Sequence, residues 1–133
     1  MTTVFADTFY YFALLSPTDA AHARAVESTR TYTGKMVTTA WVLTELADGM
    51  AAPANRPVFI DFLAALRADP DVTLIGPDLE LLDAGIALYA SRPDKNWSLT
   101  DCISFVVIGR ERISEALTGD HDFEQAGFQA LLK

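Results

Sequence analysis

The sequence has very few of the residues that build disulfides or zinc sites. It contains one cysteine, Cys102, and two widely separated histidines, His22 and His121. A single cysteine excludes a disulfide within the chain and fits a reducing compartment. Paired cysteines or histidines at the spacing of metal ligands are missing as well. Because Cys102 lies in an apolar segment with no histidine at a matching position, we interpret it as a core residue rather than a nucleophile.

Long apolar runs are also missing. The longest two, Phe9–Leu15 and Cys102–Gly109, are far shorter than the roughly 20 residues that span a bilayer. The first residues, MTTVFAD, have no basic segment followed by an apolar stretch, so they do not have the pattern of a signal peptide. We therefore expect a cytoplasmic protein with no membrane attachment.

Basic residues are scarce: 10 lysines and arginines stand against 18 acids, a net charge of −8. This balance excludes the simplest nucleic-acid binder, a basic patch on a basic domain, but allows an acidic site that recruits cations. Half of the 133 residues are apolar and 14 are aromatic, which is enough for a real core. We expect a single domain over residues 1–133.

Strand and helix patterns alternate along the chain, and hairpin signals are few. The pattern predicts strands at Thr3–Ala6, 35–40, 72–76, 115–120 and 128–132, helices at 8–15, 20–29, 39–50, 59–66, 78–90 and 98–112, and a short turn at 122–125. This alternation favours a three-layer α/β/α fold with a mainly parallel sheet of roughly five strands. In such folds ligands bind at the carboxyl ends of the strands, so the residues directly after a strand matter most.

Four acids stand at such places. Asp7 follows the first predicted strand, Asp120 and Asp122 follow the fourth, and Asp101 lies at the start of an apolar helix. Carboxylates that meet at one edge of a sheet repel one another in a low dielectric, and hard divalent cations relieve that repulsion. A set of acids without cysteine or paired histidine selects Mg²⁺ or Mn²⁺ over zinc.

Each acid also has an ordinary explanation. Asp7 can cap the helix that follows it, and Ser98-x-x-Asp101 and Asp122-x-x-Gln125 both fit capping boxes. Glu45 can be a solvated position on its helix, and His121 is more typical of a solvated loop histidine than of a ligand. An alternative to an enzyme is therefore a non-catalytic α/β interaction module whose acids cap helices or form a docking surface for a basic partner.

Four segments taken together resemble the PIN-domain family, and most closely its branch of VapC-type toxins. They are VFADTFYYFALL, TTAWVLTELADG, SLTDCISFVV and ALTGDHDFEQAGFQALL, which together span the chain. The last is the most specific, through its pattern LT-x-D-x-x-F-x-x-x-G-F. The resemblance implies a PIN-like fold and a ribonuclease that depends on Mg²⁺ or Mn²⁺.

The resemblance also implies roles for individual residues. Asp7, Glu45, Asp101 and Asp120 match the family's catalytic, metal-binding quartet, and Asp122 matches an additional acid that some members have. Thr118 matches a frequent Ser/Thr near the site, and we expect Thr8 to support the site similarly. Members of this branch usually form homodimers and are inhibited by a small cognate antitoxin, a segment of which enters the acidic groove.

The hypothesis is thus hydrolysis of an RNA phosphodiester by the toxin of a toxin–antitoxin pair. A bound metal would lower the pKa of a water, which Asp101 or Glu45 would orient. Candidate substrate-binding residues are Arg92, Lys95, Arg110 and Arg112. A phosphate-accepting receiver domain fits less well, because Asp7 stands alone after the first strand. None of the three lysines, Lys35, Lys95 and Lys133, stands where such a domain has its lysine.

Overall fold

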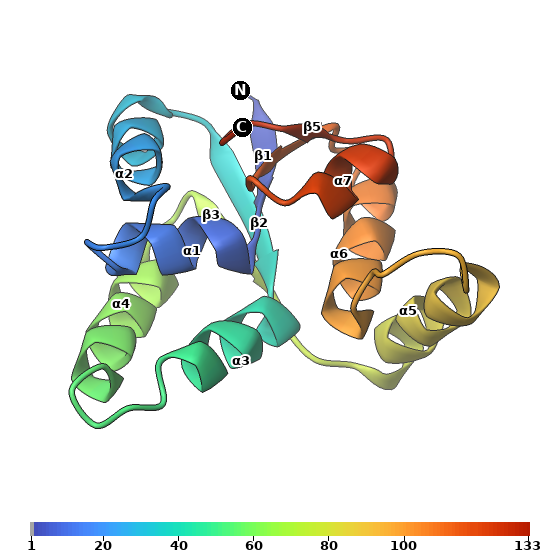
Figure 1. Cartoon of the computed structure of the whole chain (residues 1–133), viewed down its shortest axis with the longest axis horizontal. Helices are drawn as coiled ribbons and strands as arrows, with labels where there is room; N and C mark the ends of the chain where they lie inside the picture. The colour runs from blue at the N-terminus through green and yellow to red at the C-terminus, as the bar shows by residue number, and fades with distance from the viewer. Residues whose placement is uncertain (1) are drawn as a thin grey trace.

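The computed structural model describes residues 2–133 and has a parallel β-sheet at its centre (Figure 1). Strands and helices alternate along most of the chain, as the sequence pattern predicted. In chain order the elements are β1 (Thr3–Ala6), α1 (Thr8–Leu15), α2 (His22–Thr31), β2 (Lys35–Thr39), α3 (Ala40–Gly49), α4 (Arg56–Ala68), β3 (Val72–Ile75), α5 (Leu79–Ser91), α6 (Leu99–Arg110), β4 (Glu115–Leu117), α7 (His121–Gln125) and β5 (Gln129–Ala130).

The five strands are ordered β3-β2-β1-β4-β5, and every neighbouring pair is parallel. β1 is central, with Phe5 aligned with Val37 of β2 on one side and with Ala116 of β4 on the other. The chain first builds the sheet outward through β2 and β3, then crosses back to add β4 and β5. The order therefore reverses between β1 and β4, and ligands of open α/β sheets bind beside such a point. The predicted α/β class with a parallel sheet is confirmed.

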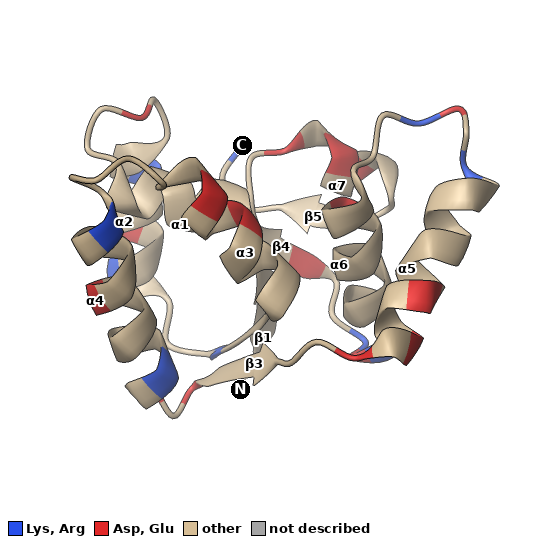
Figure 2. Cartoon of the chain, turned by 90° about the horizontal axis from the view of Figure 1, so that it is seen from below, with Lys and Arg blue, Asp and Glu red and all other residues tan. Residues whose placement is uncertain are grey.

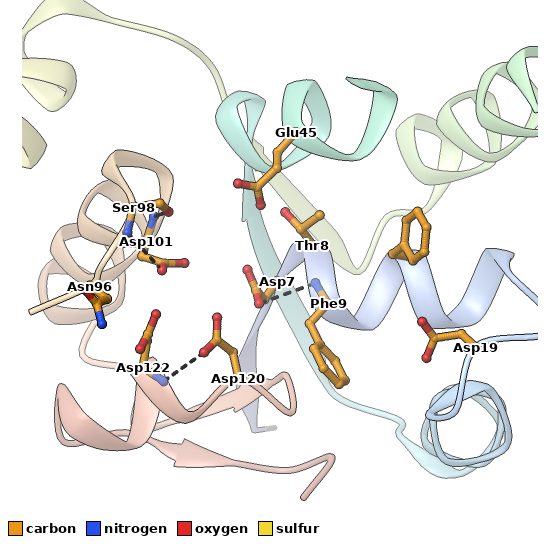
Figure 3. Close-up of a pocket in the computed structure, with 11 residues that line it drawn as sticks. Asp7, Thr8, Phe9, Asp19, Glu45, Asn96, Ser98, Asp101, Asp120 and Asp122 are labelled. Atoms are coloured by element: carbon orange, nitrogen blue, oxygen red, sulfur yellow. Dashed lines mark hydrogen bonds between the residues drawn. The ribbon is translucent and has the colours of Figure 1, made fainter. Parts of the chain in front are cut away.

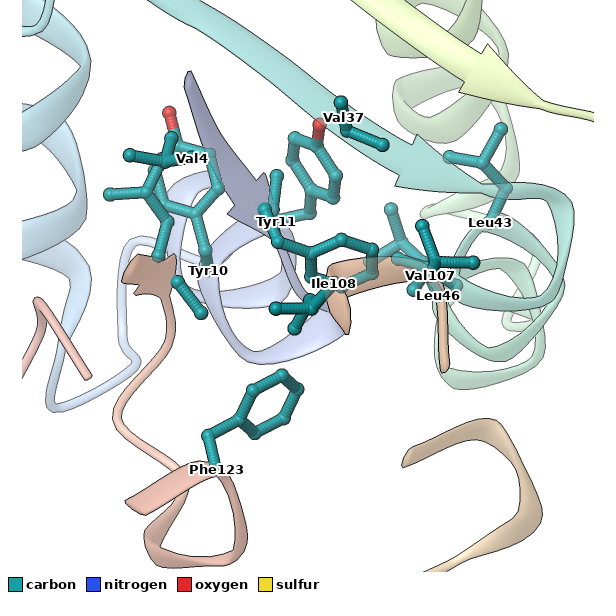
Figure 4. Close-up of a cluster of buried hydrophobic side chains, with 14 of the residues drawn as sticks. Val4, Tyr10, Tyr11, Val37, Leu43, Leu46, Val107, Ile108 and Phe123 are labelled. Atoms are coloured by element: carbon teal, nitrogen blue, oxygen red, sulfur yellow. The ribbon is translucent and has the colours of Figure 1, made fainter. Parts of the chain in front are cut away.

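Helices cover both faces of this sheet, with α1, α2 and α4 on one side and α5, α6 and α7 on the other (Figures 1 and 2). Val4, Phe5 and Ala6 of β1 are buried, as expected for a central parallel strand covered on both faces. Figure 4 shows Val4 within the cluster of buried apolar side chains. α6 is buried over most of its length and packs closely on α5, where a side chain on Gly85 would collide with Ile103. No helix within residues 2–133 is long and apolar enough to cross a membrane.

Three local predictions are wrong. The predicted turn at 122–125 is the helix α7, which begins earlier because Asp120, and not Asp122, is its N-cap. α2 begins at His22 rather than at residue 20, because the carboxylate of Asp19 accepts the backbone N–H of Ala21 in a preceding turn. The last strand is confined to Gln129–Ala130, a short edge strand.

Candidate active site

Acidic side chains from five segments of the chain line one cavity at the carboxyl edge of the sheet (Figure 3). The cavity has a volume of about 470 Å³. Its lining residues are Asp7, Thr8, Phe9, Phe12, Asp19, Glu45, Asn96, Ser98, Asp101, Asp120 and Asp122. All five acids that the sequence singled out are among them, although they lie as many as 115 positions apart in the chain, from Asp7 to Asp122.

Asp7 lies at the base of this cavity, directly after β1, and is only 3% exposed. Its backbone N–H donates to the carbonyl of Leu117 (3.3 Å), which joins the end of β1 to the end of β4. Its carboxylate caps α1 by accepting the N–H of Phe9 (3.4 Å), and it also accepts the hydroxyl of Thr118 (2.8 Å). Burial raises the pKa of Asp7 to about 7, against the lowering effect of these hydrogen bonds.

Asp101 faces the cavity from the first turn of α6 and is 8% exposed. The predicted capping box is present: Ser98 Oγ accepts the N–H of Asp101 (3.0 Å), and the Asp101 carboxylate accepts the N–H of Ser98 (3.3 Å). The pKa of Asp101 is raised to about 8, mainly by burial and also by the nearby charges of Asp7 and Asp120. The same carboxylate thus caps a helix and faces other acids.

Asp120 and Asp122 complete the acidic wall from the β4–α7 connection. Asp120 is the N-cap of α7 and accepts the N–H of Asp122 (2.9 Å), so the following turn holds both side chains on one side. One carboxylate oxygen from each of Asp101, Asp120 and Asp122 can be chosen so that all three lie within 4.8 Å of one another. Three carboxylates this close repel one another unless a proton or a cation lies between them.

The hydroxyl of Thr118 connects the two halves of the site. Thr118 is fully buried at the end of β4, donates to Asp7 (2.8 Å) and accepts the backbone N–H of Asp120 (3.0 Å). One hydroxyl therefore orients the carboxylate after β1 and the turn after β4. The sequence resemblance indicated Thr118 as a supporting residue, and the structure places its hydroxyl between Asp7 and Asp120.

Glu45 and Thr8 lie on the opposite wall. α3 follows β2 without a loop, because Thr39 both ends the strand and caps the helix through the N–H of Val42 (3.2 Å). This connection places the exposed Glu45 over the same sheet edge, where it faces Asp7 (Figure 3). The hydroxyl of Thr8 donates to the carbonyl of Val42 (3.5 Å), so it contacts α3 rather than a carboxylate.

The donor set fits a hard divalent cation. The candidate ligands are carboxylate oxygens, which Mg²⁺ and Mn²⁺ prefer, and among the described residues no cysteine or histidine lines the cavity. Burial is the largest cause of the raised pKa values of Asp7 and Asp101, and neighbouring acids add to it, so a cation in the cavity would favour the ionised forms of both carboxyl groups. The three clustered carboxylates could hold such an ion, with Asp7 at the base of the cavity and Glu45 on the opposite wall.

The structure separates the four basic residues that the sequence proposed for substrate binding. Arg92 and Lys95 lie in the α5–α6 loop, which leads into Asn96 and Ser98 at the cavity. Arg110 lies at the opposite end of α6 from Asp101, where it pairs with Glu80 (2.6 Å), and Arg112 follows it. The expectation for Arg110 and Arg112 is not met by their position.

Three polar lining residues were not expected from the sequence. Asn96 and Ser98 stand close to Asp101 in the chain, and this proximity was the signal that could have identified them. Asp19 reaches the cavity through the turn between α1 and α2, and no sequence motif marks it.

Comparison with known proteins identifies the fold. No model of a known family matches the chain, and no curated protein of similar sequence was found. Among solved structures, the chain is similar to VapC20 of Mycobacterium tuberculosis, described as a toxin that cleaves the sarcin-ricin loop. The two are 24% identical, with 94% of this chain and 95% of that chain covered and a TM-score of 0.85.

Two further structures are similar over nearly their whole length. FitAcB from Neisseria gonorrhoeae is 17% identical, with 96% and 94% of the two chains covered and a TM-score of 0.67. VapBC2 from Rickettsia felis, bound to a DNA fragment from their promoter, is 11% identical, with 97% and 96% covered and a TM-score of 0.67. The resemblance that the motifs indicated is confirmed at the level of the fold: this chain has the fold of the PIN-domain toxins.

Proposed function

We propose that this protein is a divalent-metal-dependent endoribonuclease and the toxin of a toxin–antitoxin pair. The observation that supports this most directly is the convergence of Asp7, Glu45, Asp101, Asp120 and Asp122 on one cavity at the carboxyl edge of the sheet. These acids come from four separate segments, so local helix capping alone does not account for their meeting. VapC20, which has the same fold, is described as a toxin that cleaves the sarcin-ricin loop.

In this proposal Asp101, Asp120 and Asp122 hold Mg²⁺ or Mn²⁺, with Asp7 as a further ligand from the base of the cavity. Such an ion supplies positive charge at the scissile phosphate and makes a neighbouring water more acidic. The chain's own contribution is to fix the ligands before the substrate arrives: Thr118 orients Asp7, and the capping box orients Asp101. Ordered ligands lose little freedom when the transition state forms.

Glu45 has a different role in the proposal. It lies outside the group of three close carboxylates and is exposed on the wall opposite them. A carboxylate in that position accepts a hydrogen bond from the attacking water. This hydrogen bond orients the water so that a lone pair of the water oxygen faces the phosphate. Asp101 is the second candidate for this role, as the sequence suggested.

The partners follow from the same proposal. Among residues 2–133 no lysine or arginine lines the cavity itself, and Arg92 and Lys95 lie in the loop that leads into it. In this proposal the RNA therefore enters the cavity past these two cations. A small antitoxin with a basic side chain would block the acids, and the protein would act as a homodimer in the cytoplasm. Two of the similar structures come from FitAcB and VapBC2.

A second candidate function is a non-catalytic interaction module. The observation in its favour is that Asp7, Asp101 and Asp120 all take part in capping a helix. A module of this kind would show little gain in thermal stability with Mn²⁺, whereas a metal site gains stability by binding the ion only in the folded state.

The test is cleavage of pooled cellular RNA with Mg²⁺, with Mn²⁺ and with EDTA. Asp7→Asn keeps a side-chain oxygen that can cap α1 and removes the charge, and Asp7→Ala removes both. Asp48→Asn is the matched control, because Asp48 is an exposed acid on α3 that does not line the cavity. We expect cleavage by the wild type and the control with either metal, and none in EDTA or by either Asp7 variant. Full activity in folded Asp7→Asn would overturn the proposed site.

A further inference from the structure

A second cavity adjoins the acidic one. It has a volume of about 460 Å³ and lies where the end of α5 turns into the start of α6. Asn96 lines both cavities, so the two are neighbours on one continuous surface. The second cavity is lined by Tyr89, Ala90, Arg92, Pro93, Lys95, Asn96, Trp97 and Cys102.

Its charge is opposite to that of the acidic cavity. Arg92 and Lys95 both lie over the ring of Trp97, at 5.1 Å and 6.0 Å from its centroid. Both also contact the one acid of this loop, Asp94, at 3.1 Å and 3.7 Å. Two cations thus share one carboxylate and leave a net charge of +1 beside a cavity lined with acids. Figure 2 shows these charges on the α5–α6 loop.

Trp97 fixes this arrangement. It is buried, its indole N–H donates to the side chain of Gln125 (3.1 Å), and its ring packs edge-on against Phe105, with centroids 5.0 Å apart. Its indole is therefore in contact with the core on one side and with the two cations on the other. The cations, held on this ring, are positioned rather than free in solvent.

Tyr89 supplies the exposed aromatic surface. It lies in the last turn of α5 and is 55% exposed, whereas Tyr10 and Tyr11 are buried in the core. An exposed aromatic ring next to two cations is the pair of groups that single-stranded nucleic acid uses, one for the base and one for the phosphate. The carboxylates of an acidic peptide would pair with the two cations but would not stack on the tyrosine ring.

We infer that this cavity is a nucleotide subsite beside the scissile phosphate. In this inference, which rests on the proposed function, Tyr89 stacks on an unpaired base of the RNA, and Lys95 and Arg92 hold a phosphate next to that base. The acidic cavity repels the phosphodiester chain unless cations are near it, and the subsite supplies those cations on the side where Asn96 joins the two cavities. Tyr89 is a substrate-positioning residue and takes no part in the bond cleavage.

The inference is tested with Tyr89→Ala, Lys95→Gln and the conservative Tyr89→Phe. Ile86→Ala is the matched control, because Ile86 is a 43% exposed apolar residue on the same helix that does not line this cavity. Two quantities are measured: KM and kcat for an RNA that the wild type cleaves, and the Kd of a fluorescein-labelled random oligoribonucleotide by anisotropy. Anisotropy uses each substitution in an Asp101→Asn background, so that binding is read without cleavage.

Loss of one base stack should weaken binding roughly 5- to 150-fold. We expect Tyr89→Ala to raise KM and Kd in this range with kcat within about twofold of the wild type, Lys95→Gln to raise both, and Tyr89→Phe and Ile86→Ala to change neither. Unchanged KM and Kd in Tyr89→Ala would overturn the subsite, as would an equal loss in Ile86→Ala. If the wild type cleaves no RNA but Tyr89→Ala still weakens binding, the proposed function fails and the subsite stands.

Discussion

Removing the charge of Asp7 should make the metal-free protein more stable in alkaline solution, even though we expect the same change to abolish cleavage. Burial raises the pKa of this carboxyl from 3.8 to about 7. The folded state therefore binds the proton more tightly than the unfolded state does. This contribution to stability is complete below pH 3.8, declines as the pH rises, and is lost above about pH 7.

The magnitude follows from the shift. Each pKa unit is worth about 1.4 kcal/mol, so between pH 5 and pH 7 the free energy of unfolding should fall by about 2 kcal/mol through Asp7 alone. Asp101, whose pKa is raised to about 8, adds a further decline in the free energy of unfolding, which ends about one pH unit higher than that of Asp7. Because the two carboxylates interact, their contributions do not simply add.

The assay is urea unfolding of EDTA-treated protein at pH 5, 7 and 9. Wild type, Asp7→Asn and the exposed control Asp48→Asn are compared. The amide of Asp7→Asn still offers an oxygen to Thr118 and to the N–H of Phe9, so the variant loses the ionisation and keeps the cap. We expect its stability relative to the wild type to improve by about 3 kcal/mol from pH 5 to pH 9. A difference that does not change with pH would refute the idea that buried, uncompensated charge is concentrated at Asp7.

Two further predictions concern the hydroxyl at the site and the α5–α6 contact. Thr118→Val keeps the shape of the side chain but removes the donor to Asp7 and the acceptor for the N–H of Asp120. We expect this variant to lose at least tenfold in RNA cleavage and Thr118→Ser to retain most of the wild-type activity. Equal activity of the two variants would contradict the positioning role of the hydroxyl. Gly85→Ala should destabilise the fold by about 1–3 kcal/mol in thermal unfolding, because the new methyl group meets Ile103. Gly109→Ala, which meets open space in α6, should be neutral or slightly stabilising, and similar melting temperatures for the two variants would contradict the packing argument.

Much of the site could be predicted from the sequence because it depends on topology. The carboxyl ends of β1 and β4 are neighbours in a parallel sheet, so residues that follow those strands, Asp7 and Asp120, must lie close together. The start of a buried helix, marked by Ser98 and Asp101, faces the same edge. The capping signals at Asp7 and at Ser98-x-x-Asp101 were also correct, because one carboxylate can accept a backbone N–H and still face a cavity.

Other features depend on contacts that a sequence pattern does not contain. Glu45 has no motif apart from the family resemblance, because its position follows from the direct connection of β2 to α3. Asp120 caps α7 in competition with Asp122, and the pattern alone favoured the wrong one. Arg110 seemed near Asp101 in sequence, yet the rise of α6 separates the two by about 13 Å along its axis.

The central claim is that one acidic cavity both binds the divalent ion and cleaves RNA. The most direct test is a titration of EDTA-stripped protein with Mn²⁺, in which RNA cleavage and the thermal shift are followed in the same samples. We predict that both rise with the same half-saturating concentration and that both disappear in Asp101→Asn. Metal-independent cleavage, or cleavage retained by Asp101→Asn, would contradict the claim.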